Sequence, residues 1–249
     1  MSIGRHAGNL RKPSIVSEET MLRTVLECGI VPFFENAVAG YSVEEMTDPY
    51  YWFDGEAGVL GPWDWKIGCV QSGDVFYGKY LCGGKAAFAT LEWYKELRNY
   101  RQSLPKYELL DGPQKLVMDY LKEHGSISVK EVRGLLGVKK SAADALLTRL
   151  QMQCRVVIGD IVRVYRGEDL HYSGWQVASF CRPEDLVDSG SFPGASSGGG
   201  VPGAPAGFPF GGVSLECSHT PMESYSLLSS RITELTGETS PKLIAKILG

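Results

Sequence analysis

The sequence predicts an α+β fold, on three observations. The chain has 249 residues, 43% of them hydrophobic, which is enough to bury a core in one large domain or two small ones. Residues 49–101 are dense in aromatic residues and glycine, and they combine a hairpin signal with a helix signal. Residues 105–187 contain three helical patterns followed by two strand-like runs. We therefore expect an aromatic-rich α+β unit at residues 17–104 and a second unit at residues 105–187.

The start of the chain is expected to be a loose arm followed by short helices. Residues 1–16 are polar and basic without periodicity, which is typical of a flexible arm. Ser17 is suited to cap a first helix that ends at Gly29. Ser42 and Glu45 have the capping-box spacing of a second short helix.

The aromatic-rich unit is expected to contain a hairpin and a helix. The runs "VFYGKYL" and "KAAFAT" flank Cys82-Gly83-Gly84, which indicates a tight turn between two strands. Thr90 then precedes a helical pattern over residues 91–100. The unit carries Trp63, Trp65, Phe76, Tyr77, Tyr80, Trp93 and Tyr94. Such a density is more typical of a domain core than of a platform for extruded or single-stranded bases. Asp64 and Lys66 are the ionisable residues interleaved with its tryptophans.

The second unit is predicted to be a winged helix-turn-helix. Pro113 opens its first helical pattern, and Ser128 with Glu131 forms a capping box at the start of the next. Gly137 is suited to end that helix. A third helix follows over residues 140–153, and its apolar stripe, expected to be buried, consists of Ala143, Leu146, Leu147 and Leu150. The strand-like runs "RVVIGDIVRVY" and "SGWQVASF" complete the order of a winged helix.

The end of the chain is predicted to be a linker and a helical tail. Residues 188–212 are rich in glycine, serine and proline, a composition that cannot bury a core. The C-terminal tail, residues 213–249, contains two helical patterns, the second with Ser240 as cap and Pro241 in its first turn. We expect this helix pair to pack back onto the body of the protein.

Positive charge is concentrated in the second unit. The whole chain has a net charge of -4, which argues against coating nucleic acid through charge alone. Residues 126–155 contain six Lys or Arg residues against Glu131 and Asp144, a local balance of +4. A winged helix that reads DNA would use the start of its third helix and its wing. The residues expected there are Arg133, Lys139, Lys140, Ser141, Arg149, Arg163 and Arg166. The alternative is that this unit binds protein and that its lysines are only solvated.

The sequence does not indicate several other kinds of functional site or targeting segment. The six cysteines form no CxxC pair, so we expect reduced thiols, no metal site and no cofactor. The four histidines are far apart and suggest no catalytic triad, and no phosphate-binding glycine motif is present. No signal-peptide pattern or apolar stretch of membrane-spanning length occurs. The expectation is a cytoplasmic protein without a membrane partner.

Two glutamines at the end of the third helix allow two interpretations. Gln151 and Gln153 point about 200° apart on a regular helix, so they can share one site only where the helix gives way to strand. In the first interpretation they hydrogen-bond helix carbonyls and solvent. In the second, the pair positions a water or stabilises a developing sugar cation as catalytic residues.

Three segments carry a family resemblance. They are "GPWDWKIGCVQSGDVFYGKYLCGGKAAFATLEWYKELRNYR", "LLTRLQMQ" and "YSGWQVASFCRPEDL". Over residues 18–187 the chain resembles the AlkZ-related family, which is named for AlkZ/YcaQ-type DNA glycosylases built from winged-helix units. The resemblance implies association with DNA and, by analogy, excision of alkylated or crosslinked bases. Gln151-Met152-Gln153 fits the glutamine-apolar-glutamine motif of those glycosylases.

Three hypotheses of function follow. The leading one is a winged-helix protein that binds double-stranded DNA, with no enzymatic role demonstrated by the sequence. The second is a glycosylase-like hydrolase of damaged DNA that uses Gln151 and Gln153. The third is a winged-helix module that binds a protein partner.

Overall fold

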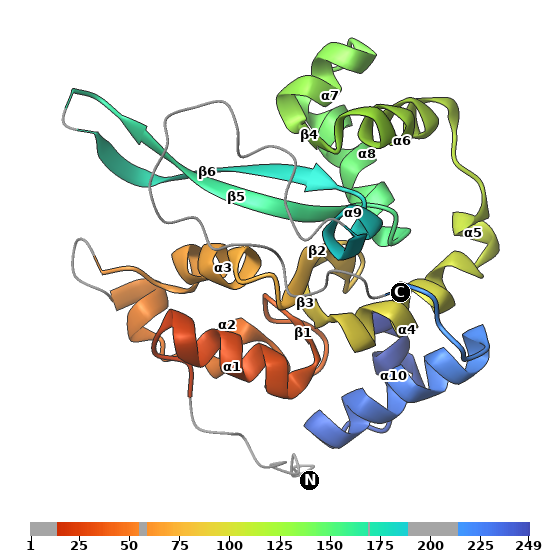
Figure 1. Ribbon diagram of the computed structural model, residues 1–249. Coiled ribbons are helices and arrows are strands. Elements are labelled where there is room, and N and C mark those ends of the chain that lie inside the picture. The colour runs from red at the N-terminus through yellow and green to blue at the C-terminus, as the bar shows by residue number, and fades with distance from the viewer. Residues whose placement is uncertain (1–13, 55–58, 169, 189–213) are drawn as a thin grey trace, which may run out of the picture.

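One antiparallel sheet runs through both predicted units. The computed structural model describes residues 14–54, 59–168, 170–188 and 214–249 (Figure 1). Its sheet has six strands in the order β1-β3-β2-β5-β6-β4. The strands are β1 (Ile30–Pro32), β2 (Val75–Leu81), β3 (Lys85–Thr90), β4 (Ser126–Ser128), β5 (Val157–Arg166) and β6 (His171–Cys181). The fold is therefore mixed α and β with an antiparallel sheet. Most of the predicted arm and linker lies outside the described residues.

Helices from both halves of the chain surround this sheet. Those before the middle of the chain are α1 (Glu18–Cys28), α2 (Val43–Met46), a π-helical turn η1 (Tyr50–Asp54), α3 (Pro62–Gln71), α4 (Leu91–Gln102) and α5 (Pro105–Glu108). Those after it are α6 (Gly112–His124), α7 (Val129–Leu136), α8 (Lys140–Met152), α9 (Pro183–Asp188), α10 (Pro221–Thr236) and α11 (Pro241–Leu248). Figure 1 shows α6, α7 and α8 together at one end, with α1, α2, α4 and α10 at the other. No helix in the described part of the chain has the length and apolar character to cross a membrane.

The sheet joins segments that are far apart in sequence. β2 and β3 form the predicted hairpin, and Cys82, Gly83 and Gly84 in its turn all have positive φ. β2 also pairs with β5 through Tyr77 and Ile158, so the two predicted units share one sheet. β5 and β6 form a long hairpin, and β4 pairs with the far edge of β6.

Three of the predicted helix caps are present, whereas Thr90 and Ser240 stand at the N-cap positions of α4 and α11 without a side-chain hydrogen bond to the helix. The side chains of Ser17, Ser42 and Ser128 each accept a hydrogen bond from a backbone N–H in the first turn of α1, α2 and α7. Gly137 ends α7 in the left-handed conformation, as expected from its position in the sequence. The helix α3 was not expected. It begins with Pro62 in its first turn and brings both Asp64 and Lys66 onto the sheet.

The core has two clusters of buried side chains. The larger one surrounds β1, β2 and β3 and includes residues of the tail such as Leu228 and Ile247. The smaller one lies among α6, α7, α8 and the hairpin. Trp65, Phe76, Tyr77, Tyr80 and Tyr94 are all buried, which confirms that most of the aromatic run is core. The tail packs against the body, with α10 on α4. The end of the predicted arm is also held, because Ile15 is fully buried and pairs with Thr47.

The buried side of α8 agrees with the expected apolar stripe at Ala143, Leu147 and Leu150 but not at Leu146. Leu147 and Leu150 are buried, with 1% and 0% of their surface exposed. Leu146, expected to be buried, is only half-buried and packs at the edge of the smaller cluster.

Candidate functional site

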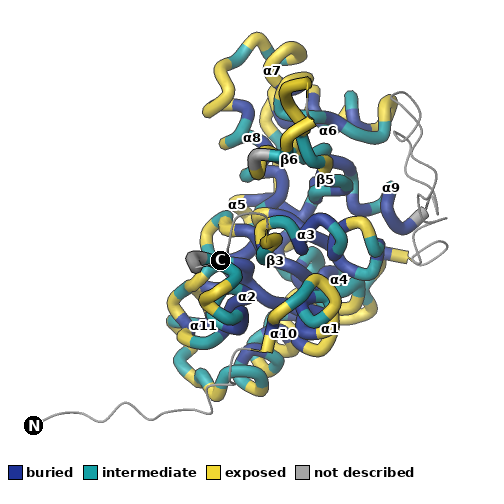
Figure 2. The backbone as a smooth tube through the Cα atoms, turned by 90° about the vertical axis from the view of Figure 1, so that its left-hand side faces the viewer, coloured by how far each residue is buried: buried dark blue, intermediate teal, exposed yellow. Residues whose placement is uncertain are grey.

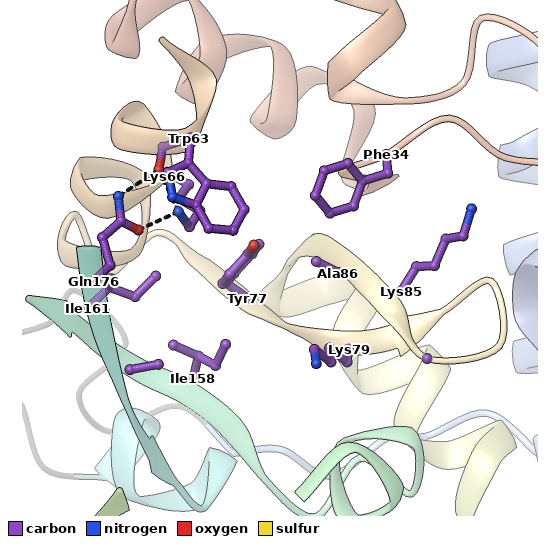
Figure 3. Close-up of a pocket in the computed structure, with 12 residues that line it drawn as sticks. Phe34, Trp63, Lys66, Tyr77, Lys79, Lys85, Ala86, Ile158, Ile161 and Gln176 are labelled. Atoms are coloured by element: carbon purple, nitrogen blue, oxygen red, sulfur yellow. Dashed lines mark hydrogen bonds between the residues drawn. The ribbon is translucent and has the colours of Figure 1, made fainter. Parts of the chain in front are cut away.

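A cleft of about 470 Å³ opens on one face of the sheet. Its walls come from the segment after β1, from α3 and from both hairpins. The lining residues are Phe34, Trp63, Lys66, Tyr77, Lys79, Gly84, Lys85, Ala86, Ile158, Ile161, Gln176 and Ala178. Figure 3 shows Phe34 and Trp63 on either side of the opening, with Tyr77 between them. The volume is in the range of small-molecule sites.

Lys66 is the buried cation of this cleft. Only 3% of its surface is exposed. Its ammonium group donates to the backbone oxygen of Trp63 and to Oε1 of Gln176, and it lies 3.4 Å from the centre of the Trp63 ring (Figure 3). Burial lowers the pKa of Lys66 to about 7, although the charge of Asp64 opposes the shift. The amine can therefore change its charge near neutral pH.

A polar network holds the neighbouring carboxylate. The Tyr172 hydroxyl donates to Oδ1 of Asp64, and Nε of Arg163 lies 3.6 Å from the same oxygen. Nε2 of Gln176 donates to the Tyr172 hydroxyl at 2.9 Å and to the Trp63 carbonyl at 3.1 Å. Burial, followed by the bond to Asp64, raises the pKa of Tyr172. The network fixes α3 against the β5–β6 hairpin and so shapes one wall of the cleft.

Two exposed lysines stand at the rim of the cleft. Lys79 and Lys85 are both exposed, and Nζ of Lys85 donates to the backbone oxygen of Glu35 at 3.0 Å. The rim and the walls thus combine positive charge with the rings of Phe34 and Trp63. This combination suits a flat aromatic ligand that carries negative charge, such as a base attached to a phosphate backbone.

The residues expected to contact DNA lie on two surfaces. Arg133, Lys139, Lys140, Ser141 and Arg149 are all exposed on α7, on α8 or on the turn between them, and Figure 2 shows how much of α7 is exposed. The other two belong to the hairpin. Arg166 is exposed there and lies 5.4 Å from the ring of Trp175. Arg163 is half-buried and faces Asp64 at the cleft, so the structure separates it from the α7–α8 group.

The two glutamines lie at the end of α8, and both are buried. Gln151 donates through Nε2 to the Leu147 carbonyl at 3.0 Å and accepts at Oε1 from the Lys79 backbone N–H at 2.8 Å. It therefore links α8 to β2 behind the rim of the cleft. Gln153 is fully buried, and neither of its amide atoms has a hydrogen-bond partner among the described residues. Their catalytic role stays a prediction.

An apolar groove of about 730 Å³ lies on the outer side of α6, α7 and α8. Leu116, Leu135 and Leu146 line it, and the first two are exposed by 54% and 40%. The groove is lined almost entirely by aliphatic side chains, unlike the cleft with its lysines and rings. The protein-binding hypothesis stays a prediction.

Sequence reasoning found some of the cleft residues and missed others. Asp64 and Lys66 were singled out, but Phe34, Tyr172 and Gln176 were not. Tyr172 and Gln176 are separated by an even number of residues on one strand, which places them on the same face. That signal was visible in the sequence, but nothing in it indicated that this strand would face α3.

Comparison with known proteins gives one match. No curated protein and no solved structure shows significant similarity to the chain. The family model described as AlkZ related matches residues 15–198, which is most of the chain and includes the cleft, α7 and α8. The chain therefore belongs to the AlkZ-related family.

Proposed function

We propose that this protein binds double-stranded DNA through a winged helix-turn-helix. The order α6, β4, α7, α8, β5 and β6, with β4 paired to β6, is the connectivity expected of that motif. In it α8 is the recognition helix and the β5–β6 hairpin is the wing. The first residues of a recognition helix face base edges, and its flanks face phosphates.

The exposure of the cations on α7 and α8 carries this proposal. Lys139, Lys140 and Arg149 are exposed, and no ion pair holds any of them among the residues that the structure describes. They belong to a segment with a local balance of +4 in a chain of -4. Free, clustered cations neutralise phosphates and release counterions, which supplies most of the affinity of such proteins for DNA.

The cleft supports a second part of the proposed function, the binding of a base extruded from the duplex. α8 borders it, because a Cβ atom at Gly84 would lie 3.0 Å from the Thr148 side chain. DNA held on α8 would therefore pass near the rim lysines Lys79 and Lys85. A base extruded from the duplex would enter between Phe34 and Trp63 and stack there.

Salt-dependent binding tests the proposal. The triple variant Lys139→Ala, Lys140→Ala, Arg149→Ala should bind duplex DNA more weakly, and the slope of log K against log salt should fall by about 1 for each phosphate that the variant no longer neutralises. Fluorescence anisotropy of a labelled duplex across a salt series measures both quantities.

A control with the same change of charge separates direct phosphate binding from net charge. Arg23, Lys242 and Lys246 are exposed on α1 and α11, and none of them belongs to α7, α8 or the β5–β6 hairpin. Replacing these three by alanine removes as much charge and should leave the salt slope unchanged. Equal slopes in both triple variants would overturn the assignment of α8 as the DNA-binding surface.

A glycosylase-type hydrolase is the second candidate, and the cleft favours it. A buried lysine with a perturbed pKa in a concave site is typical of catalytic centres. Cleavage of a glycosylic bond passes through a sugar with cationic character, which an amide oxygen can stabilise. Gln151 and Gln153 are buried and do not line the cleft, so this role requires that the bound DNA displaces the residues that cover them. Release of a free base from alkylated duplex, at stoichiometric protein, separates this candidate from binding alone.

The glutamine variants need a control for folding. Gln151→Ala also removes the link between α8 and β2, so its circular dichroism spectrum and duplex affinity must match the wild type. Loss of base release with retained affinity supports the hydrolase, since phosphate contacts carry most of the binding energy. If the wild type releases no base, the second candidate is wrong.

A further inference from the structure

A cysteine, a histidine and a glutamate meet where the tail packs on α4. Glu96 lies on α4 and is 8% exposed, while Cys217 and His219 lie just before α10. One ligand atom from each residue lies within 4.8 Å of the other two. The sequence did not indicate this group, because Glu96 and Cys217 are 121 residues apart.

The three side chains converge on one point. Nδ1 of His219 lies 2.8 Å from Oε1 of Glu96, and Sγ of Cys217 lies 3.4 Å from Oε2 of the same carboxylate. The sulfur and Nδ1 are 4.0 Å apart. Donor atoms that share a tetrahedral zinc ion lie about 3.3–3.6 Å from one another, given zinc–ligand distances of about 2.0–2.3 Å. Of the observed separations, the one of 3.4 Å lies within that range, the one of 2.8 Å below it and the one of 4.0 Å above it.

This convergence distinguishes the cluster from a catalytic triad. A triad is a chain in which the nucleophile contacts one imidazole nitrogen and the carboxylate contacts the other. Here the carboxylate and the sulfur both approach Nδ1 of His219. A proton relay from Cys217 through His219 to Glu96 therefore has no path in this arrangement, whereas an ion between the three donors contacts all of them.

A second set of residues orients the donors. Ser224 is fully buried and donates to Oε2 of Glu96 at 2.5 Å. Asn99 donates to the Ser224 hydroxyl at 2.9 Å and to the backbone oxygen of His219 at 2.7 Å. Burial raises the pKa of Glu96, but the hydrogen bonds from Ser224, His219 and Cys217 outweigh it and keep the pKa below the ordinary value. The carboxylate is thus ionised and fixed, as metal ligands commonly are.

We propose that Glu96, Cys217 and His219 form a zinc site that fastens the C-terminal tail to α4. A thiolate, an imidazole and a carboxylate are ligands that zinc accepts together, and a water completes the tetrahedron. The site is independent of the proposed DNA surface, because its ligands lie on α4 and before α10. Two of its three ligands also lie beyond residues 15–198, the part that matches the family.

Metal content of the full chain tests the site. The wild type, incubated with Zn²⁺ and dialysed, should retain about one zinc ion per chain, measured by elemental analysis. Cys217→Ser and His219→Ala should each lose most of it. Cys82→Ser and His171→Ala are the controls, since neither residue belongs to the cluster. Zinc should also raise the melting temperature of the wild type but not that of Cys217→Ser.

Cobalt substitution keeps the proposal testable if the variants fold poorly. Co²⁺ bound by a thiolate gives charge-transfer absorption in the near ultraviolet, so the wild type alone can report a sulfur ligand. A wild type that retains no zinc and shows no such absorption overturns the proposal. Zinc retained equally by Cys217→Ser and His219→Ala overturns it too, because the ion would then lie elsewhere.

Discussion

The cleft and the α7–α8 surface both carry lysines, but the innermost lysine of the cleft, Lys66, is held in the opposite way to those of the surface. Lys66 is buried beneath Trp63 and bonded to Gln176. Lys139 and Lys140 are exposed at the start of α8. A buried cation loses its hydration, and its pKa and position are set by neighbours. An exposed cation keeps an ordinary hydration shell and acts through screened attraction at a distance.

Under the proposed function, the difference suits the two surfaces to different tasks. Exposed lysines can draw in a polyanion and tolerate many geometries, which suits contact with a phosphate backbone. Lys66 cannot serve in that way without leaving its site, but it can orient one group placed in the cleft. Binding by the surface and discrimination by the cleft would thus be separable functions. The following predictions test that separation, starting with the largest expected effect.

Lys66 should make stability depend on pH in a way that Lys140 does not. Its pKa is about 7 in the folded protein and 10.5 as the ordinary value, so above pH 7 the unfolded chain binds more protons. The free energy of unfolding should therefore rise as the pH rises from about 7. Lys66→Met should remove this rise, and Lys140→Met should leave it intact. Urea denaturation at a series of pH values measures the change.

The pH range of this test must end below the pH at which the buried thiols affect stability. Burial raises the pKa of Cys69 from 9.0 to about 12 and that of Cys154 from 9.0 to about 11, so above pH 9 these groups lower stability instead. The comparison therefore applies between pH 7 and pH 9. Identical curves for wild type and Lys66→Met in that window would show that Lys66 is as solvated as Lys140.

The sequence could predict the α7–α8 surface better than it could predict the cleft. Capping residues such as Ser128 and the left-handed Gly137 are local signals, so α7 and its turn follow from a few neighbouring positions. The cations of this surface are likewise close in sequence, since Lys139 is the N-cap residue of the helix that contains Lys140 and Arg149. The cleft depends on β2 meeting β5 at a single pair, Tyr77 and Ile158, which are 81 positions apart by their numbers. No local pattern encodes such a pairing.

The aromatic run shows the same limit of prediction from sequence. Density alone correctly indicated that most of the rings form the core. It could not indicate that Trp63, 45% exposed, would differ from Trp65, 7% exposed, because only the docking of α3 on the sheet decides which side of the helix is covered. The contact of Glu96 with Cys217 and His219 could not be predicted from the sequence for the same reason, because it depends on how the tail packs against α4.

The next largest predicted effect is a loss of stability on shortening a buried side chain of α8. Leu147→Ala should lower the free energy of unfolding by about 2–5 kcal/mol, because it leaves a cavity in the small core cluster. Leu146→Ala, at a half-buried position one residue away, should cost less than about 1.5 kcal/mol. Chemical denaturation of both variants measures the difference. A larger loss for Leu146→Ala would mean that the helix is rotated relative to its described phase.

The smallest effect concerns the ring at the mouth of the cleft. If the cleft takes an unpaired base, Trp63→Ala should weaken binding to a duplex with one unpaired base by about 1–3 kcal/mol, the usual contribution of one stacked base. Binding to the fully paired duplex should be unchanged, because the α8 cations carry it. Tyr50→Ala is the control, since Tyr50 is an exposed aromatic residue (39%) outside the hairpin and α8, and it does not line the cleft. An equal loss on both duplexes for Trp63→Ala would place the ring in general backbone contact and remove the distinction between the two surfaces.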